Sequence, residues 1–328
     1  MAPLIDVNPF IPGATPQQAA SILGAMCGVA ETNSRLSEAD RRALAAASRY
    51  IFGDTQPLDV DKVQPVSPAA LAGALPDPAL REDALKFATV MAFIDGSLDK
   101  AKIAKVVDYA NALGVHERYI DEIAEAAAGH VKEALADMTR ANMLSITGKD
   151  WQDADATAWL MPYAKAPDPQ LAARCEALGS LPEGSFGLAF YRHYRSNGYS
   201  FPGEPSGLNA GFGFPHDTAH VVSGYDTSPR GELLVSTFTA AMHRRLPMAG
   251  HILPVIFSWH LDIQINLVAK HAKGGLDPEE FWHAYAGGKT ATVDTFAPDW
   301  DFWKYVETPL QALRRQWSIP EDGLDREV

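Results

Sequence analysis

The stretch ALKFATVMAFI, residues 84–94, decides the fold class. Apolar side chains recur three, four and seven positions after Ala84, which places them on one face of a helix. The same spacing continues in residues 106–113 and ends at Gly114, a residue that readily adopts the left-handed conformation after a helix. No alternating run of Val, Ile and Thr is long enough for a sheet, so the sequence predicts an all-α protein.

The composition predicts a globular chain without a nucleic-acid partner. The chain has 328 residues, 47% of them hydrophobic, which is enough for one large domain or two of ordinary size. Its formal net charge is −13 at pH 7. Because phosphate backbones and anionic bilayers repel such a charge, we expect neither nucleic-acid binding nor electrostatic attachment to a membrane.

The cysteines and the first residues indicate a cytoplasmic protein. Cys27 and Cys175 lie far apart and lack CxxC spacing, so they predict neither a disulfide framework nor a thiolate metal site. Residues 1–13 show no signal peptide, and no window approaches the roughly 20 apolar residues of a spanning helix. Peripheral contact with the inner face of the membrane through apolar side chains stays compatible with this, as does a homodimer.

The chain is predicted to divide into an N-terminal helical bundle, residues 1–147, a linker, residues 148–168, and a C-terminal all-helical domain, residues 169–328. The linker is polar, aromatic and proline-bearing, and Asp168 followed by Pro169 is a typical helix start. In the C-terminal domain we expect helices near residues 169–179, 184–197, 215–223, 229–245, 250–273, 278–286 and 299–317.

A faint internal repeat occupies the N-terminal bundle. NSRLSEAD begins at Asn33 and DGSLDKAK begins at Asp95, an offset of 62 residues (95 − 33). In each copy a leucine follows a polar turn, and an N-cap residue, Ser37 or Asp99, starts the next helix. The repeat predicts two helix–turn–helix units that pack face to face.

Residues 16–142 resemble the tellurite-resistance TerB-like domain, a small helical bundle. The resemblance rests on the Asp-Gly-x-Leu turn at Asp95 and the acid that follows it. Because a lysine stands where a glutamate is expected, we favour a structural or partner-binding bundle over a cation site. The positions where that family would place cation-binding acids hold Asn33, Asp40, Asp95 and Lys102.

The segment FPHDTAHVVSGYDTSPRGE, residues 214–232, carries the candidate metal ligands. His216 and His220 are four positions apart, so on a helix both imidazoles point to one side. Glu232 follows about one turn into a second helix, which Ser228 would cap. If the intervening turn brings these three side chains together, they leave coordination positions open for water or substrate, and this favours chemistry over bracing.

Asp217 and the other histidines leave alternatives open. Asp217 is rotated from His216 by about 100° on a helix, so it could ligate the ion or accept a hydrogen bond from a ligand histidine. A metal-dependent hydrolase would need a further histidine and a distant aspartate, for which His193 and Asp262 are candidates. Since the chain has ten histidines, pairs four apart also arise by chance. We expect ordinary core or surface roles for His243, His251, His260, His271 and His283.

Residues 167–320 resemble the coenzyme Q biosynthesis protein 4 family. The likeness extends to the helix pair and loop of residues 167–205, to Gly224 and Gly231, and to the closing segment YVETPLQALRRQWSIP, residues 305–320. That family carries His-Asp-x-x-His, eleven further residues and Glu, a pattern matched without a gap by His216, Asp217, His220 and Glu232.

Two departures from that family bear on the substrate. The GFGFP segment before His216 holds three helix breakers, so we expect the helix to start at Pro215. Asp217 would then lie in the first turn, where the helix dipole favours a carboxylate. Ala219 stands where the family is associated with a large aromatic residue, and the smaller side chain would widen the pocket beside the ligands.

The resemblance implies a metal-dependent lyase of ubiquinone biosynthesis, which oxidatively decarboxylates a polyprenylated hydroxybenzoate or a quinone-like lipid. It implies one divalent ion, with zinc as the first choice and iron or manganese as alternatives that can support oxygen chemistry. The family also organises other pathway enzymes, so a non-catalytic lipid-binding scaffold stays open as an alternative. A general metal-dependent hydrolase is a further alternative. The implied metal ligands and catalytic residues are His216, Asp217, His220 and Glu232.

An isoprenoid tail would need an apolar wall, and residues 248–271, MAGHILPVIFSWHLDIQINLVAKH, are the candidate for it. The simpler role of this segment is a core helix of the domain, which we favour. Phe186, Phe190 and Tyr194 recur every four residues and are expected in the core, with lining as an additional role.

Overall fold

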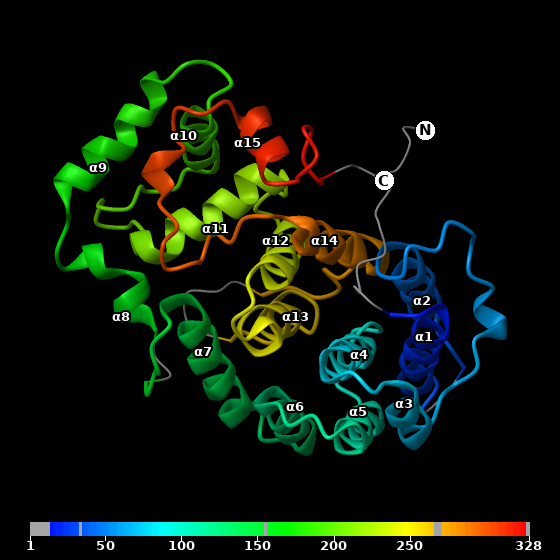
Figure 1. Ribbon diagram of the computed structural model, residues 1–328. Helices are drawn as coiled ribbons and strands as arrows, with labels where there is room; N and C mark the ends of the chain where they lie inside the picture. Colours follow the sequence, from blue (N-terminus) through cyan, green and yellow to red (C-terminus); the bar gives the residue numbers. More distant parts are fainter. Residues whose placement is uncertain (1–13, 33–34, 154–155, 266–270, 326–328) are drawn as a thin grey trace. The chain divides into compact units, whose positions relative to one another are not determined.

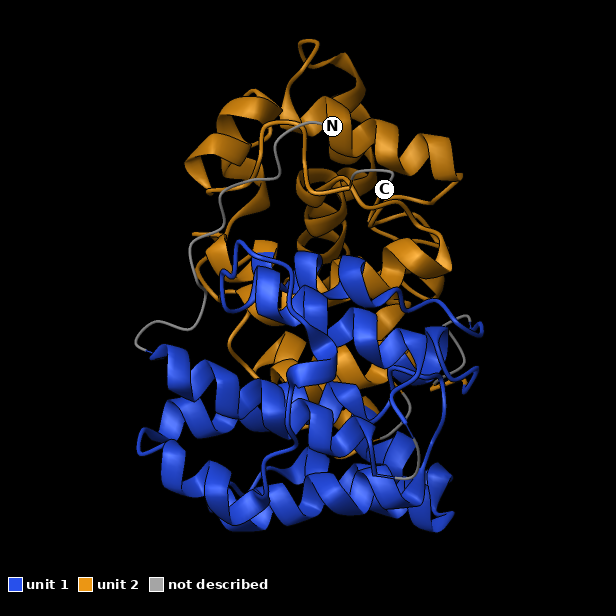
Figure 2. Ribbon diagram, turned by 90° about the vertical axis from the view of Figure 1, so that its right-hand side faces the viewer, with its two compact units in different colours: residues 1–138, 256–263, 271–286 blue, residues 139–255, 264–270, 287–328 orange. Residues whose placement is uncertain are grey.

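The computed structural model describes residues 14–32, 35–153, 156–265 and 271–325. Within these residues the chain forms fifteen α-helices and no β-strand, so the predicted all-α class is confirmed (Figure 1). None of the helices in the described ranges has the length and hydropathy needed to cross a bilayer. The chain forms two compact units, and each is built from segments that are not contiguous in the sequence (Figure 2).

Unit 1 comprises residues 1–138, 256–263 and 271–286. Its helices are α1 (Pro16–Ala30), α2 (Glu38–Tyr50), α3 (Pro68–Ala74), α4 (Pro78–Met91), α5 (Lys100–Leu113), α6 (Arg118–Ala128), the first part of α7 (Val131–Thr147), the end of α13 (Leu253–Trp259) and most of α14 (Pro278–Thr290). The first helices of the two repeat copies, α1 and α4, pack on each other, as the face-to-face prediction requires. Trp282 is fully buried, and its ring meets that of Phe87 edge-on at 5.4 Å.

Both predicted N-caps of the repeat are present. The side chain of Ser37 accepts a backbone N–H at the start of α2, and that of Asp99 accepts two at the start of α5. Gly114 ends α5 with a φ of +66°, in the left-handed region where glycine is favoured. Asn33, the first residue of the repeat, lies outside the described residues.

Lys102 places a cation between carboxylates in unit 1. Its ammonium lies 2.6 Å from Asp95 and 3.8 Å from Asp40, and the side chain is only 5% exposed. Burial acts to raise the pKa of Asp95, but the hydrogen bond from Lys102 and contacts with Ser97 outweigh it, so the pKa is lowered. A lysine charge in this position supports the structural role that we favour for the bundle.

Unit 2 comprises residues 139–255, 264–270 and 287–328. Phe186, Phe190 and Tyr194 are buried, as predicted for core residues. This grouping differs from the predicted division at residues 147 and 168, because residues 139–168 pack within unit 2 and two later segments return to unit 1. Unit 2 contains the end of α7, α8 (Thr157–Leu160), α9 (Pro169–Glu176), α10 (Phe186–Asn197), α11 (Ala210–Ser223), α12 (Pro229–Met242), the start of α13 (Leu253–Trp259) and α15 (Leu310–Gln316).

The predicted start of a helix at Pro215 is wrong, because α11 begins at Ala210. Asn209 caps it by accepting the N–H of Gly211 at 2.8 Å. Pro215 lies inside the helix, and because proline has no N–H, the carbonyl of Gly211 loses its helical hydrogen bond. Gly211 is exposed, so its carbonyl can bind water instead. Asp217 is therefore a mid-helix residue, and the helix dipole does not account for its place.

The helix expected over residues 250–273 is also wrong in extent. A π-helical turn, Pro247–Ile252, leads into α13, which ends at Trp259. The chain leaves the helix there, and Asp262 adopts a φ of +62°. Residues 266–270 of the candidate wall lie outside the described residues, and the wall itself stays a prediction.

The segment expected as one helix over residues 299–317 is divided. A 3₁₀ turn, Phe302–Lys304, is followed by α15, which starts after Pro309. Pro309 has a ψ of 130°, outside the helical range, and this separates the 3₁₀ turn from α15.

Candidate metal centre

The turn between α11 and α12 brings Glu232 to the histidines. Gly224 ends α11 with a φ of +88°, and Ser228 caps α12 by accepting the N–H of Gly231 at 3.1 Å. A Cβ atom on Gly231 would overlap the carbonyl oxygen of Asp226, so glycine is what allows this close packing. Glu232 consequently lies in the first turn of α12, as predicted.

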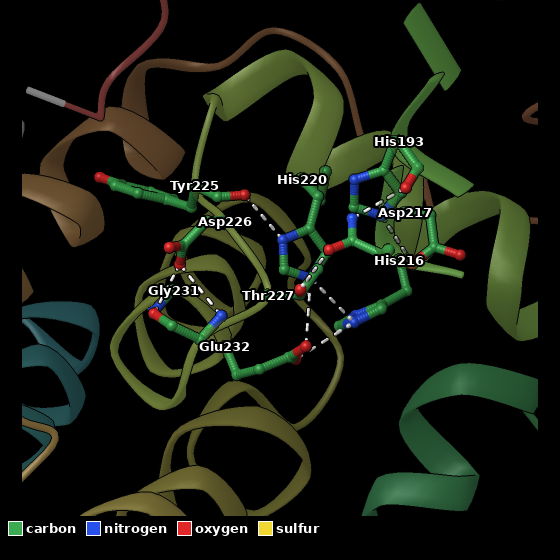
Figure 3. Close-up of polar contacts among 12 residues, drawn as sticks. His193, His216, Asp217, His220, Tyr225, Asp226, Thr227, Gly231 and Glu232 are labelled. Carbon is green, nitrogen blue, oxygen red and sulfur yellow. Dashed lines mark hydrogen bonds and ion pairs between the residues drawn. The ribbon is translucent and has the colours of Figure 1, made fainter. Parts of the chain in front are cut away.

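Three side chains from these two helices converge (Figure 3). Nε2 of His216 lies 3.3 Å from Nε2 of His220. Glu232 places Oε2 at 3.5 Å from the first of these nitrogens and Oε1 at 3.7 Å from the second. Metal bonds to such atoms are about 2.0–2.2 Å long, so three donors at these separations can share one ion.

The backbone carbonyl of Tyr225 fixes the orientation of His220. Its oxygen lies 2.9 Å from Nδ1, and because a carbonyl oxygen can only accept, Nδ1 carries the proton. In the neutral ring the Nε2 lone pair then faces His216 and Glu232 (Figure 3). Metal-bound histidines are commonly held by such an outer hydrogen bond.

The charges of the three side chains are complementary. Burial acts to raise the pKa of Glu232, but the hydrogen bonds and charges of the two histidines outweigh it and hold the pKa well below its usual value. Burial acts to lower the pKa of His216, yet Glu232 overcomes this and the pKa is raised. Three donors that face one another need a cation among them, either a proton or a metal ion. The residues therefore fit a divalent metal ion.

Asp217 is engaged from α10. Its Oδ2 accepts the hydroxyl of Tyr194 at 2.5 Å, and its Oδ1 lies 3.7 Å from Nε2 of His193. Burial acts to raise the pKa of Asp217, but His193 and the other imidazoles outweigh it, so the pKa is lowered. A ligand atom of Asp217 also lies within 4.8 Å of ligand atoms of His216 and His220. The predicted alternatives, ligand and outer acceptor, are both compatible with these distances.

Aromatic side chains that the sequence did not mark lie beside the centre. The ring of Phe212 stacks on that of His216, with centroids 4.8 Å apart and planes 16° apart. Phe212 was missed because its segment was expected to precede the helix. Phe212 is also one of four half-buried residues that pack on a small core of Met143, Ala156 and Leu160. The other three are Trp151, Trp159 and Met161.

The remaining candidate residues have other neighbours. Of the two residues named for a hydrolase, His193 lies at this centre, and Asp262 of unit 1 lies 2.7 Å from His271. The other histidines have partners of their own. His243 lies 2.8 Å from Asp294, and His251 lies 2.8 Å from Ser145. His260 lies 3.1 Å from the Phe93 carbonyl, and the ring centroids of His283 and Tyr50 are 5.2 Å apart.

Comparison with known protein families finds none that matches the chain. A search of curated proteins finds no match either. The two family resemblances therefore stay predictions that rest on the quoted residues. Ala219 is fully buried on α11, and the wider pocket expected beside it stays a prediction as well.

Proposed function

We propose that this protein is a metal-dependent enzyme with its centre at His216 and His220 of α11 and Glu232 of α12. The observation that carries the proposal is the convergence of two imidazole nitrogens and a carboxylate within 3.3–3.7 Å of one another. Three protein ligands leave positions for water and substrate, which is typical of catalytic metal sites. When bound, the ion would polarise a carboxylate or phenolate oxygen, and iron or manganese would add oxygen chemistry.

The exposure of the ligands indicates the side from which substrate approaches. The His220 side chain is 1% exposed, whereas those of His216 and Glu232 are 16% and 23% exposed. His220 is thus the anchored ligand, held from behind by Tyr225. Substrate would reach the centre past His216 and Glu232.

The aromatic neighbours favour an apolar, aromatic substrate. Phe212 stacks on the more open histidine and continues into the group with Trp159 and Trp151. Offset and edge-on contacts with such rings would hold a planar aromatic acid. Together with the resemblance described above, this supports oxidative decarboxylation of a polyprenylated hydroxybenzoate or a quinone-like lipid in ubiquinone biosynthesis.

A second candidate is a metal-dependent hydrolase, because His193 lies next to Asp217 and adds donors to the centre. A third is a lipid-binding scaffold, in which the ion only braces α11 against α12 and the N-terminal bundle recruits other enzymes. The first two candidates predict different substrates, and the scaffold predicts a bound ion without turnover.

The test compares His220→Ala and Glu232→Gln with His271→Ala, an exposed histidine of unit 1. We expect the first two variants to lose bound metal and turnover of a prenylated hydroxybenzoate, and the control to keep both. Full decarboxylation by metal-free protein would overturn the metal dependence on which the proposal rests. Turnover of a chromogenic phosphoester instead would favour the hydrolase, and bound metal without any turnover would favour the scaffold.

A further inference from the structure

Nε2 of His193 is a buried polar atom that has no hydrogen-bond partner in the part of the chain that the structure describes. The side chain projects from α10 and is 11% exposed. Buried polar atoms are nearly always hydrogen-bonded, so such an atom points to a missing ion or water. Oδ1 of Asp217 is 3.7 Å away, which is too far for a hydrogen bond.

The other histidine–aspartate pairs among the described residues are at hydrogen-bond distance. His243 lies 2.8 Å from Asp294, and His271 lies 2.7 Å from Asp262, both at hydrogen-bond length. The pair of His193 and Asp217 is more buried than the exposed His271 pair, yet it stays open. A gap between a buried imidazole nitrogen and a buried carboxylate oxygen is the arrangement expected where a cation binds both atoms.

The pair of His193 and Asp217 lies beside the first three ligands. The ring of His193 stacks on the ring of His220, with centroids 5.3 Å apart and planes 27° apart. His193 therefore lies against the face of the His220 ring, and a ligand atom of Asp217 lies within 4.8 Å of ligand atoms of His216 and His220. Tyr194 holds Oδ2 of Asp217 at 2.5 Å, which leaves Oδ1 directed to His193.

We propose that His193 and Asp217 bind a second divalent cation beside the ion held by His216, His220 and Glu232. One imidazole nitrogen and one carboxylate oxygen suit zinc or manganese, with water or substrate oxygens in the remaining positions. Two ions about 3.5–4 Å apart can clamp two oxygens of one substrate. The inference rests on the proposed function for the first ion, and it assigns Asp217 to the second ion.

The test is metal counting on the full-length protein, stripped with chelator and reloaded with Mn²⁺ or Zn²⁺ alone. We expect two ions per chain in the unchanged protein and one in His193→Ala, with the tighter ion retained. In the Mn²⁺ form, electron paramagnetic resonance should show a spin-coupled pair, which His193→Ala converts to an isolated ion. Asp217→Asn, which keeps the shape of the side chain, should act in the same way.

Each outcome separates this inference from the proposed function. One ion in the unchanged protein, or two in a folded His193→Ala variant, would overturn the second site and leave the first intact. No bound ion in the unchanged protein would overturn both. Tyr194→Phe removes the hydroxyl without removing a ligand, and we expect it to weaken only the second ion. Circular dichroism of every variant verifies that its helices are intact.

Discussion

His260 is held as a neutral imidazole by three backbone groups of unit 1. Nε2 lies 3.1 and 3.3 Å from the carbonyl oxygens of Phe93 and Ile94, and Nδ1 accepts the N–H of Leu276 at 3.2 Å. A proton on Nδ1 would face that N–H and break the contact. Burial lowers the pKa of His260, and the two carbonyls with Asp95 counter it only in part.

This histidine should make the stability of unit 1 fall toward acid pH. Since the folded-state pKa is below the unfolded value of about 6.5, the unfolded chain binds the proton first. The free energy of unfolding should then fall by up to about 1.4 kcal/mol per pH unit below pH ~6.5, until the folded-state pKa is reached. Urea unfolding at a series of pH values measures this. His260→Gln cannot titrate and should flatten the slope, and an unchanged slope would contradict the prediction.

At the scale of single residues, spacing along the chain could predict that His216, His220 and Glu232 come together, but not what surrounds them. His216 and His220 share a helix face because of the helical period, and Ser228 marks the start of the next helix. The contacts from Tyr194 and His193 come from α10, more than twenty positions away in sequence. Such pairings depend on tertiary packing, which no local pattern encodes.

At the scale of elements, the end of α11 is held by Arg314 of α15. Its guanidinium donates to the carbonyls of Val222 at 2.9 Å, Val221 at 3.0 Å and Glu321 at 2.7 Å. Burial lowers the pKa of Arg314, and the charge of Asp322 counters it only in part. The last turn of the ligand helix therefore depends on a side chain from the end of the chain.

Arg314→Lys should weaken both the fold of unit 2 and its metal site. A lysine cannot reach all three carbonyls, and losing a charged hydrogen bond costs about 1.5–3 kcal/mol. Metal affinity should fall by about 10-fold, as for other groups that position ligands. Urea unfolding and competition with a chelating dye measure the two effects. Arg315→Lys, at an exposed neighbour, should change neither, and equal effects of both variants would refute the role of Arg314.

Gly231→Ala tests the turn that delivers Glu232. The new Cβ atom would overlap Asp226, so the turn must shift at a cost of about 1–3 kcal/mol in unfolding free energy. We expect weaker metal binding at the same time, since Glu232 is the next residue. Gly73→Ala in α3 is the matched control, because its Cβ would meet no atom within 4 Å. That variant should be neutral or stabilising by up to about 1 kcal/mol.

Helix ends were harder to predict than helices. GFGFP was taken as a break because glycine and proline are poor helix formers, yet Asn209 caps a helix that includes it. Conversely, the apolar spacing after Trp259 suggested more helix, whereas the chain turns at Asp262. In both places capping and packing outweighed the local propensity of the residues.

At the scale of the whole molecule, the all-α class followed from periodicity, but the membership of the units did not. Residues 256–263 and 271–286 belong to unit 1 although most of unit 2 precedes them. Trp282, the largest fully buried side chain, packs on Phe87 across nearly two hundred residues of sequence. Packing between segments so far apart in sequence cannot be predicted from the local spacing of apolar residues.

A fragment of residues 1–147 should therefore fail to fold cooperatively. It lacks the segments that place Trp282 and Phe281 in the core of unit 1. We expect a shallow thermal transition by circular dichroism, and recovery of a sharp one when a peptide of residues 256–286 is added. A fragment that melts as sharply as the full chain without the peptide would contradict the discontinuous unit.

The discontinuity also sets the order of events at the ribosome. After residue 138 has been synthesised, 148 further residues (286 − 138) must follow before unit 1 has all its segments. At about 5–20 residues per second, α1 to α6 wait about 7–30 s with the site of Trp282 uncovered. The residues of the candidate metal centre emerge during that wait. Nascent chains of this protein should therefore be clients of chaperones that shield apolar surface until translation has passed residue 286.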